Sequence, residues 1–309
     1  MSQALASARA PKPAGPLPRP WAGPGLAMVG AVAFSGKAII VKLAYRHGVD
    51  AVSLIMLRML VALPFFLLML WWAGRGKPAL DGRDRVAVAG LGFSGYYLAS
   101  LLDFLGLQYI SASLERLILY LTPAVVLVLS RCLLGRRASL RQWAAMAVGY
   151  SGLLLVFGHE LSLDGPRVVL GTGLVLASTL SYAAYLLYSG EVVRRIGSLR
   201  LTGWASSVAC GLCLLQFALL RPLDSLLHLA PAVGWLSLLN GTVCTVLPVW
   251  LVMRAIERIG AARTAQYGMV GPVSTLLLGV LILGEPFTAW VAAGSLCVLV
   301  GVMLLARAR

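Results

Sequence analysis

Ionisable side chains inside long apolar stretches are the residues of this sequence that could do chemistry. Lys37 lies in the middle of the apolar run 25–45, and Gly30, Ala33 and Phe34 share its helical face. Because a charge within a bilayer is costly, such a residue usually faces a partner or a cavity and is a functional candidate. The Lys37 ammonium, with Phe34 beside it, could bind a substrate carboxylate or phosphate. An internal ion pair or contact with trapped water is the structural alternative.

Four more ionisable residues are expected at similar depth to one another, near the outer ends of three other apolar runs. They are two bases and two acids: Arg58, Arg116, Asp103 and Glu115. One interpretation is a neutral network in which the charges compensate one another, because buried charges are normally paired. The other is that Asp103 or Glu115 is a proton-coupling carboxylate.

Aromatic and polar side chains recur at helical spacing in the same runs. Tyr96, Ser100 and Asp103 recur at 0, 4 and 7, and Ser178, Tyr182, Tyr185 and Ser189 at 0, 4, 7 and 11, so each set shares one helix face. Tyr120 and Tyr267 each precede a proline by about one turn, and Asn240 begins another polar patch. Packing between helices explains part of this set. The other part could form the wall of a site for an aromatic or amphipathic small molecule.

The composition requires a membrane around these residues. Of the 309 residues, 60% are hydrophobic and 12% are charged, whereas soluble proteins are roughly 45–50% apolar and about 25% charged. The net charge of +15 would otherwise indicate a nucleic-acid-binding protein. Because so few charged side chains cannot cover the surface of a soluble protein, a lipid bilayer is the expected partner and nucleic acid is not. Collagen, disordered chains and disulfide scaffolds are excluded by the same numbers.

Ten apolar runs follow a proline-rich segment, 1–24, that is expected to be a disordered cytoplasmic tail. A helix needs about 20 residues to cross the hydrocarbon core, and no run alternates with the period of a strand. The sequence therefore predicts an all-α membrane protein with ten transmembrane helices. The runs are 25–45, 52–73, 85–106, 110–134, 140–157, 168–189, 200–220, 232–254, 261–283 and 287–306.

The distribution of basic residues predicts the orientation. With ten spans both termini share a side, and nineteen of the 26 Lys and Arg residues fall on that side. Only Arg46, Arg167 and Arg221 fall on the opposite side. This bias predicts that both termini lie in the cytoplasm.

The two halves of the chain are related by one offset of 149 residues. Gly48 matches Gly197, Pro123 matches Pro272 and Gly152 matches Gly301, without a gap. Because each half has five spans, an odd number, the halves are expected to be inverted-topology repeats, which are typical of secondary transporters. The expected division is a first repeat at 25–157, a linker at 158–166, a second repeat at 167–306 and a cytoplasmic end at 307–309. Pro123 and Pro272 would then loosen matched helices and act as gates or hinges.

Catalysis is the alternative from another class. Ser94 and Ser151 lie in Gly-x-Ser-Gly strings that are reminiscent of an intramembrane hydrolase. Such a nucleophile needs a base within hydrogen-bond reach, and the three histidines (His47, His159 and His228) fall in expected outer loops. We therefore expect no enzyme activity, no cofactor and no metal. The sequence indicates no particular oligomeric state.

Several motifs resemble the EamA type of the drug/metabolite transporter superfamily. In the first half they are Gln108–Leu114, Leu121–Pro123 and Leu153–Val156; in the second half they are Ala255–Ala261, Gly271–Pro272, Leu283–Pro286 and Gly301–Leu305. Gly135-Arg136 departs from the Gly-Glu usual in the family at that place. The resemblance implies ten helices around a central cavity lined mainly by spans 1, 3, 4, 6, 8 and 9, with alternating access between the halves.

The resemblance also implies a secondary carrier of small molecules. Inner-membrane export of amino acids, aromatic or other neutral ones, is the first expectation, with Lys37 binding the carboxylate and the tyrosines the side chain. A sugar phosphate, a nucleotide-linked compound or a drug-like compound is the alternative cargo. A phosphorylated cargo would require two or more cations in the cavity, and only Lys37 is expected near the midplane.

Overall fold

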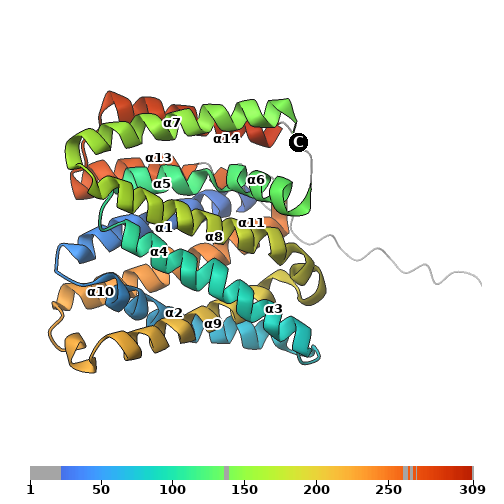
Figure 1. Ribbon diagram of the computed structural model, residues 1–309. Helices are drawn as coiled ribbons and strands as arrows, with labels where there is room; N and C mark the ends of the chain where they lie inside the picture. Colours follow the sequence, from blue (N-terminus) through green and yellow to red (C-terminus); the bar gives the residue numbers. More distant parts are fainter. Residues whose placement is uncertain (1–21, 136–138, 260–263, 265–266, 269, 308–309) are drawn as a thin grey trace, which may run out of the picture.

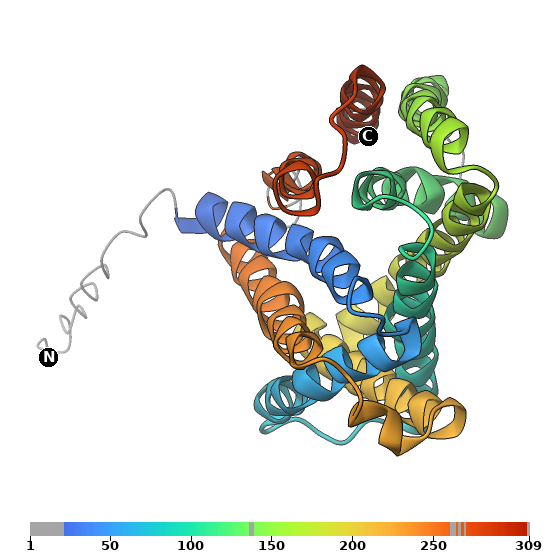
Figure 2. The same ribbon diagram turned by 90° about the vertical axis from the view of Figure 1, so that its left-hand side faces the viewer.

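A computed structural model describes residues 22–135, 139–259, 264, 267–268 and 270–307 of the chain. Every regular element in these residues is a helix, and the long helices run side by side as one bundle (Figure 1). Seen end-on, most of the helices surround a central space, while α7 (Leu140–Asp164) and α14 (Ala289–Arg307) form a separate pair at the edge (Figure 2).

The remaining described helices of the first half form four long apolar segments, one of them bent. They are α1 (Ala22–Tyr45), α2 (Ala51–Gly74), α3 (Gly82–Gly92), a π-helical turn (Phe93–Leu98), α4 (Ala99–Gly106), α5 (Ala112–Tyr120) and α6 (Thr122–Leu134). The second half contains α8 (Arg167–Ile196), α9 (Ser198–Leu220), a 3-10 turn (Leu223–Leu226), α10 (Pro231–Gly241), a π-helical turn (Thr242–Val246), α11 (Leu247–Ile259), α13 (Val270–Leu278) and a third π-helical turn (Gly279–Leu283).

Eight helical segments of the described chain are long and apolar enough to cross a membrane, and the bent pair α5–α6 raises the number to nine. These nine correspond to nine of the ten predicted runs. The tenth run, 261–283, begins among residues outside the described set, and its described part is an apolar helix at Val270–Leu283. Three helices continue well past the ends of their runs: α7 to Asp164, α8 to Ile196 and α11 to Ile259. Their last turns carry polar side chains, which a hydropathy pattern leaves out.

The break between α5 and α6 has a local cause. Pro123 lacks a backbone N–H and cannot continue the hydrogen-bond ladder of α5, but it is well accommodated in the first turn of a new helix. Leu121 joins the two helices, and the pair bends by 40°. This bend is where the predicted hinge at Pro123 lies. The matching Pro272 is buried inside α13.

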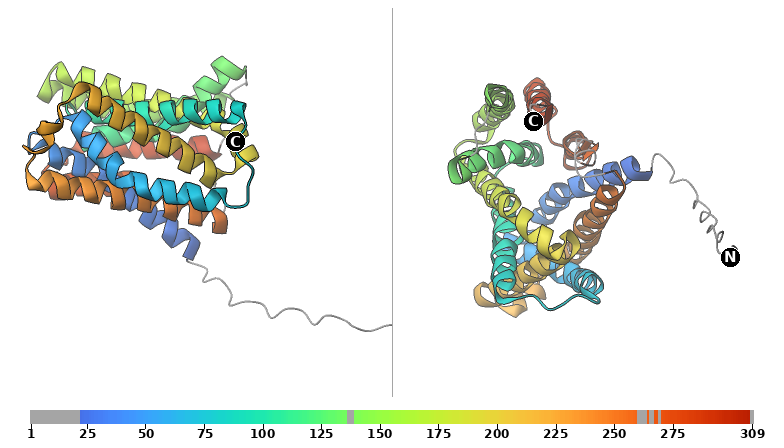
Figure 3. Two further views of the ribbon diagram at one scale, coloured as in Figure 1. Left: turned by 90° about the horizontal axis from the view of Figure 1, so that it is seen from below. Right: turned by 90° about the vertical axis from the view of Figure 1, so that its right-hand side faces the viewer.

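Glycines bring α7 and α14 into close contact. A Cβ on Gly152 would lie 2.4 Å from the carbonyl oxygen of Gly294, and one on Gly301 would lie 2.5 Å from the Gly149 nitrogen. Small residues of this kind let helices approach closely in lipid, where dispersion forces hold them together. The two-helix pair at the edge of the bundle, visible at the top of the right-hand view of Figure 3, depends on these contacts.

Two features of the backbone repeat with the offset of 149 residues. The π-helical turns in the third and eighth predicted runs begin at Phe93 and Thr242, which are 149 residues apart. In the α7–α14 contact, Gly149 meets Gly301 and Gly152 meets Val298. Adding 149 to Gly149 gives Val298, and subtracting 149 from Gly301 gives Gly152. The offset therefore converts the first pair into the second.

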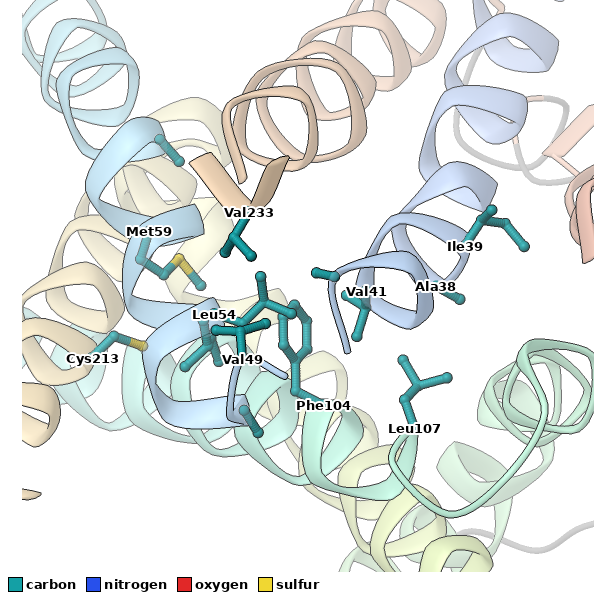
Figure 4. Close-up of a cluster of buried hydrophobic side chains, with 14 of the residues drawn as sticks. Ala38, Ile39, Val41, Val49, Leu54, Met59, Phe104, Leu107, Cys213 and Val233 are labelled. Atoms are coloured by element: carbon teal, nitrogen blue, oxygen red, sulfur yellow. The ribbon is translucent and has the colours of Figure 1, made fainter. Parts of the chain in front are cut away.

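A buried apolar cluster fixes α1, α2 and α4 beside the central space. Val41, Leu54 and Phe104 are among its fully buried members in these three helices, and Val233 of α10 closes it on one side (Figure 4). Because side chains in such a core are packed as densely as in a crystal, the polar residues on the same helices have fixed positions.

Candidate functional site

A cavity of about 460 Å³ lies in the bundle and has the size of a small-molecule site. The described residues that line it belong to α1, α2, α4, α5, α6, α8, α9 and α11, and to the π-helical turns Phe93–Leu98 and Thr242–Val246. Five of the six spans expected to line a cavity do so. The contributions of α2 and α9 were not expected, and no described residue of the expected ninth span is among the lining residues.

Lys37 lies between two carboxylates at one end of this cavity. Its Nζ is 2.5 Å from Asp103 Oδ2 and 3.1 Å from Glu115 Oε1. Lys37 and Asp103 line the cavity, whereas Glu115 is 0% exposed and lies behind them. The helices α1, α4 and α5 are thereby joined through one ammonium group, and that ammonium is already compensated before any substrate arrives.

Arg116 presents its guanidinium to the cavity between two aromatic rings. It lies 5.3 Å from the centre of the Phe34 ring and 5.5 Å from that of Tyr120, which are cation–π distances. One nitrogen donates to Ser35 Oγ at 2.8 Å, and Ser35 in turn donates to the carbonyl of Gly271. No carboxylate of the described residues is within 4.0 Å of Arg116.

Arg58 is a second cation of the cavity without an acidic partner among the residues described. Its guanidinium lies 4.6 Å from the centre of the Phe104 ring, and its Nε has no hydrogen-bond partner. Within the described part, three cations and two carboxylates therefore meet at one end of the cavity. With all five ionised the cluster carries one net positive charge. This differs from the expected neutral network of four residues, because Lys37 joins it through Asp103 and Glu115.

Tyrosines form the opposite wall. Tyr96 and Tyr182 line the cavity, together with Ser100 and Ser178. Tyr185 lies behind Tyr96: their hydroxyl oxygens are 3.3 Å apart and their rings 5.2 Å, edge to face. Gly95 makes room for this pair, because a Cβ there would lie 2.4 Å from Tyr185 Cγ. The tyrosine stripe predicted on α8 thus has one member facing the cavity and one supporting it.

The other predicted site residues divide into two groups. Phe34 and Tyr120 line the cavity. Asn240 is 0% exposed, does not line it, and has no hydrogen-bond partner for its side-chain amide among the described residues. Tyr267 is 37% exposed and is also absent from the lining. Four small polar residues of the site were missed by sequence reasoning: Ser35, Thr122, Thr202 and Ser206. Of these, Ser35 could have been predicted from the sequence, because it directly follows Phe34 and precedes Lys37 by two residues.

The Ser151 hydroxyl is exposed and donates to the carbonyl of Val148, in the turn before it, at 2.8 Å. Within the described residues no group of three His, Cys, Asp or Glu side chains is arranged to hold a metal ion.

Known proteins resemble this chain over most of its length. An uncharacterized transporter of Bacillus subtilis, YcbK, is 31% identical over 265 residues, covering 84% of each chain. A second from the same organism, YetK, is 24% identical and covers 95% of this chain and 89% of its own. The inner membrane transporter YedA of Escherichia coli is 25% identical over 60% of each chain. A solved crystal structure, 18% identical, matches the fold with a TM-score of 0.61 over 92% of this chain and 96% of its own.

The family comparison covers both halves separately. The model of the EamA-like transporter family matches residues 21–158 and again residues 169–307. The chain therefore belongs to the EamA-like transporter family, as a multi-pass membrane transporter.

Proposed function

We propose that this transporter is a secondary carrier that exports amino acids, aromatic or other neutral ones, from the bacterial cytoplasm. The observation that carries the proposal is the presence, in one cavity, of a guanidinium without an acidic partner and a carboxylate with a free oxygen. Arg116 supplies the first and Asp103 the second, since its Oδ1 has no hydrogen-bond partner among the described residues.

An amino acid matches these two groups at its backbone end. Its carboxylate would bind Arg116, whose planar fork suits a bidentate contact, and its ammonium would bind Asp103 Oδ1. Lys37 would then hold Asp103 in place and would not itself bind the carboxylate. The side chain would extend along Tyr96 and Tyr182, where an aromatic ring gains offset or edge-to-face contacts.

Alternating access between two inverted repeats is the proposed mechanism. It is supported by the separate family matches of the two halves, by the π-helical turns 149 residues apart, and by the exchangeable pairs in the α7–α14 contact. The bend at Leu121 before Pro123 supplies one flexible point, and Pro272 would supply the other. The excess of basic residues on one side supports cytoplasmic termini in the inner membrane.

A second candidate cargo is an organic anion such as a sugar phosphate or another phosphorylated metabolite. The observation that favours it is the net positive charge of the cluster, because Arg58 and Arg116 both line the cavity without an acidic partner in the described residues. A neutral zwitterion leaves that charge uncompensated, whereas a monoanion neutralises it.

A counterflow screen in liposomes tests the proposal. Liposomes that contain the purified protein are loaded with an unlabelled compound, and uptake of the same compound in labelled form is measured. The compounds screened are amino acids, nucleotides and sugar phosphates. Saturable counterflow of an aromatic or other neutral amino acid is the expected result. Counterflow of phosphorylated compounds alone would select the second candidate, and no flux of any amino acid would refute the first.

A further inference from the structure

A second cavity of about 490 Å³ lies beyond the ion-paired end of the first one. Three cations contribute to its wall, Lys42, Arg46 and Arg167, together with Glu285 and the polar residues Gln108 and Ser111. The distribution of basic residues leaves only three of them on the face opposite the termini, and two of those three, Arg46 and Arg167, lie in this cavity. This clustering of basic residues is the opposite of the charge distribution that orients the rest of the chain, in which basic residues lie on the side of the termini.

The two cavities follow one another along the same helices. On α1, Lys37 lines the first and Lys42 the second; on α5, Arg116 lines the first and its cap residue Ser111 the second. Each step is five residues, which is about 7.5 Å along a helix axis. The ion-paired layer of Lys37, Asp103 and Glu115 separates them. The second cavity is therefore the next polar space on a path through the bundle.

The acidic residue of the second cavity is already engaged. Glu285 accepts hydrogen bonds from Ala112 N at 2.7 Å, from Ser113 N at 3.2 Å and from Ser113 Oγ at 2.7 Å, and so caps α5. Arg46 donates to the carbonyl of Leu283. Arg167 is exposed and forms no ion pair with any described residue. One guanidinium thus faces the cavity with its charge uncompensated.

We propose that this second cavity is an outer binding site for the carboxylate of the transported molecule, with Arg167 as its principal cation. This rests on the proposed function for the identity of the ligand, but not for the chemistry of the site. A molecule that leaves Arg116 would meet Arg167 next, on the far side of the ion-paired layer. The positive potential there would offset the cost of passing a carboxylate by Asp103 and Glu115.

The first experiment probes the site without any substrate. Gln108 is exposed and is replaced by cysteine. Its rate of labelling from outside intact cells is measured with an anionic (sulfonate) and a cationic (trimethylammonium) methanethiosulfonate reagent. Cells that carry the protein with Gln108 unchanged give the background. The anionic reagent should react faster. Arg167→Gln should lower the ratio of the two rates by about threefold, because one nearby unit charge is removed. The matched control, Arg221→Gln, removes an exposed arginine of the same face that is paired with Asp50 outside the cavity, and should leave the ratio unchanged.

The second experiment measures transport from each side of oriented liposomes. Arg167→Gln should raise the apparent KM for amino acid supplied at the outer face by about fivefold and leave the KM at the cytoplasmic face unchanged. An equal labelling ratio in wild type and Arg167→Gln, or an equal fall in Arg221→Gln, overturns the site. If Arg167→Gln changes the labelling ratio but not the KM at the outer face, the cavity binds anions but the transported molecule is not its ligand. If in that case the labelling ratio changes only in membranes rich in anionic lipid, a phospholipid headgroup is the occupant.

The two failures are separable. If no amino acid is transported by the wild type, the proposed function fails, while the labelling ratio still decides whether the cavity is an anion site.

Discussion

Lys37 on α1 and Asp103 on α4 form a 2.5 Å ion pair inside the bundle. Glu115 of α5 shares the same ammonium at 3.1 Å, so one cation joins three helices and contacts both carboxylates of the cluster. The consequence concerns the arginines: Arg58 and Arg116 remain available in the cavity because the acids are engaged elsewhere.

Replacement of this lysine should destabilise the protein. Lys37→Met leaves two carboxylates together in the interior, and breaking a buried pair by removing one partner costs roughly 3–5 kcal/mol. We expect the melting temperature in detergent to fall by roughly 6–12 °C. The double variant Lys37→Met/Glu115→Gln should recover about half of the loss, since the more deeply buried carboxylate is then neutral. A single variant as stable as the wild type would contradict the ion pair.

The tyrosine wall should set the preference for aromatic cargo. Tyr182→Ala removes a ring that lines the cavity, so the selectivity of counterflow for phenylalanine over alanine should fall by about fivefold. Tyr188→Ala is the matched control, because Tyr188 lies on the same helix and is exposed outside the cavity lining. Competition assays with both amino acids measure the ratio. A similar change in both variants would count against a substrate contact.

The α7–α14 pair should be sensitive to a single methyl group at its contact. Gly152→Ala places a Cβ 2.4 Å from the Gly294 carbonyl, so the helices must separate, and the melting temperature should fall by several degrees. Gly158→Ala, on the same helix with no neighbouring atom within 4 Å, should leave it unchanged or slightly raised, because alanine favours a helix by about 1 kcal/mol over glycine. Equal effects of the two substitutions would refute the close approach.

Asp50 at the start of α2 predicts a dependence of stability on pH. Burial alone would raise the pKa of Asp50, but hydrogen bonds from Ser53 and the Arg221 guanidinium lower it below the ordinary value. A lowered folded-state pKa stabilises the protein above the unfolded value, about pH 4, and that contribution is lost as the pH falls through the folded-state pKa. The advantage of the wild type over Asp50→Asn in melting temperature should thus be present at neutral pH and disappear in acid. A constant difference would show that the charge has no role.

Much of the fold follows from residue patterns that act locally. Nine of the ten apolar runs correspond to helices of the described chain, because the length of a span and its flanking turns are set by nearby residues. The stripe of Tyr96, Ser100 and Asp103 faces the cavity as its helical period predicts. Equally local is the α5–α6 break, where Pro123 ends one hydrogen-bond ladder.

The site depends on contacts that no local pattern contains. Lys37, Asp103 and Glu115 meet only because α1, α4 and α5 pack together, so the sequence could single out these ionisable residues but could not show which acid pairs with which base. Asn240 has the residue type expected of a cavity wall, yet the rotation of α10 turns it away from the lining. Glu285 caps a helix 172 residues earlier in the chain, and that partnership exists only in the folded bundle.

The central claim is that Arg116 binds the carboxylate of a transported amino acid. Counterflow of L-phenylalanine and of L-phenylalaninamide, which keeps the ammonium and the ring but lacks the carboxylate, tests it in wild-type and Arg116→Gln liposomes. We predict saturable counterflow of phenylalanine alone in the wild type, and a loss of about tenfold or more in Arg116→Gln. Equal flux of acid and amide in the wild type, or an unchanged rate in Arg116→Gln, would contradict the account.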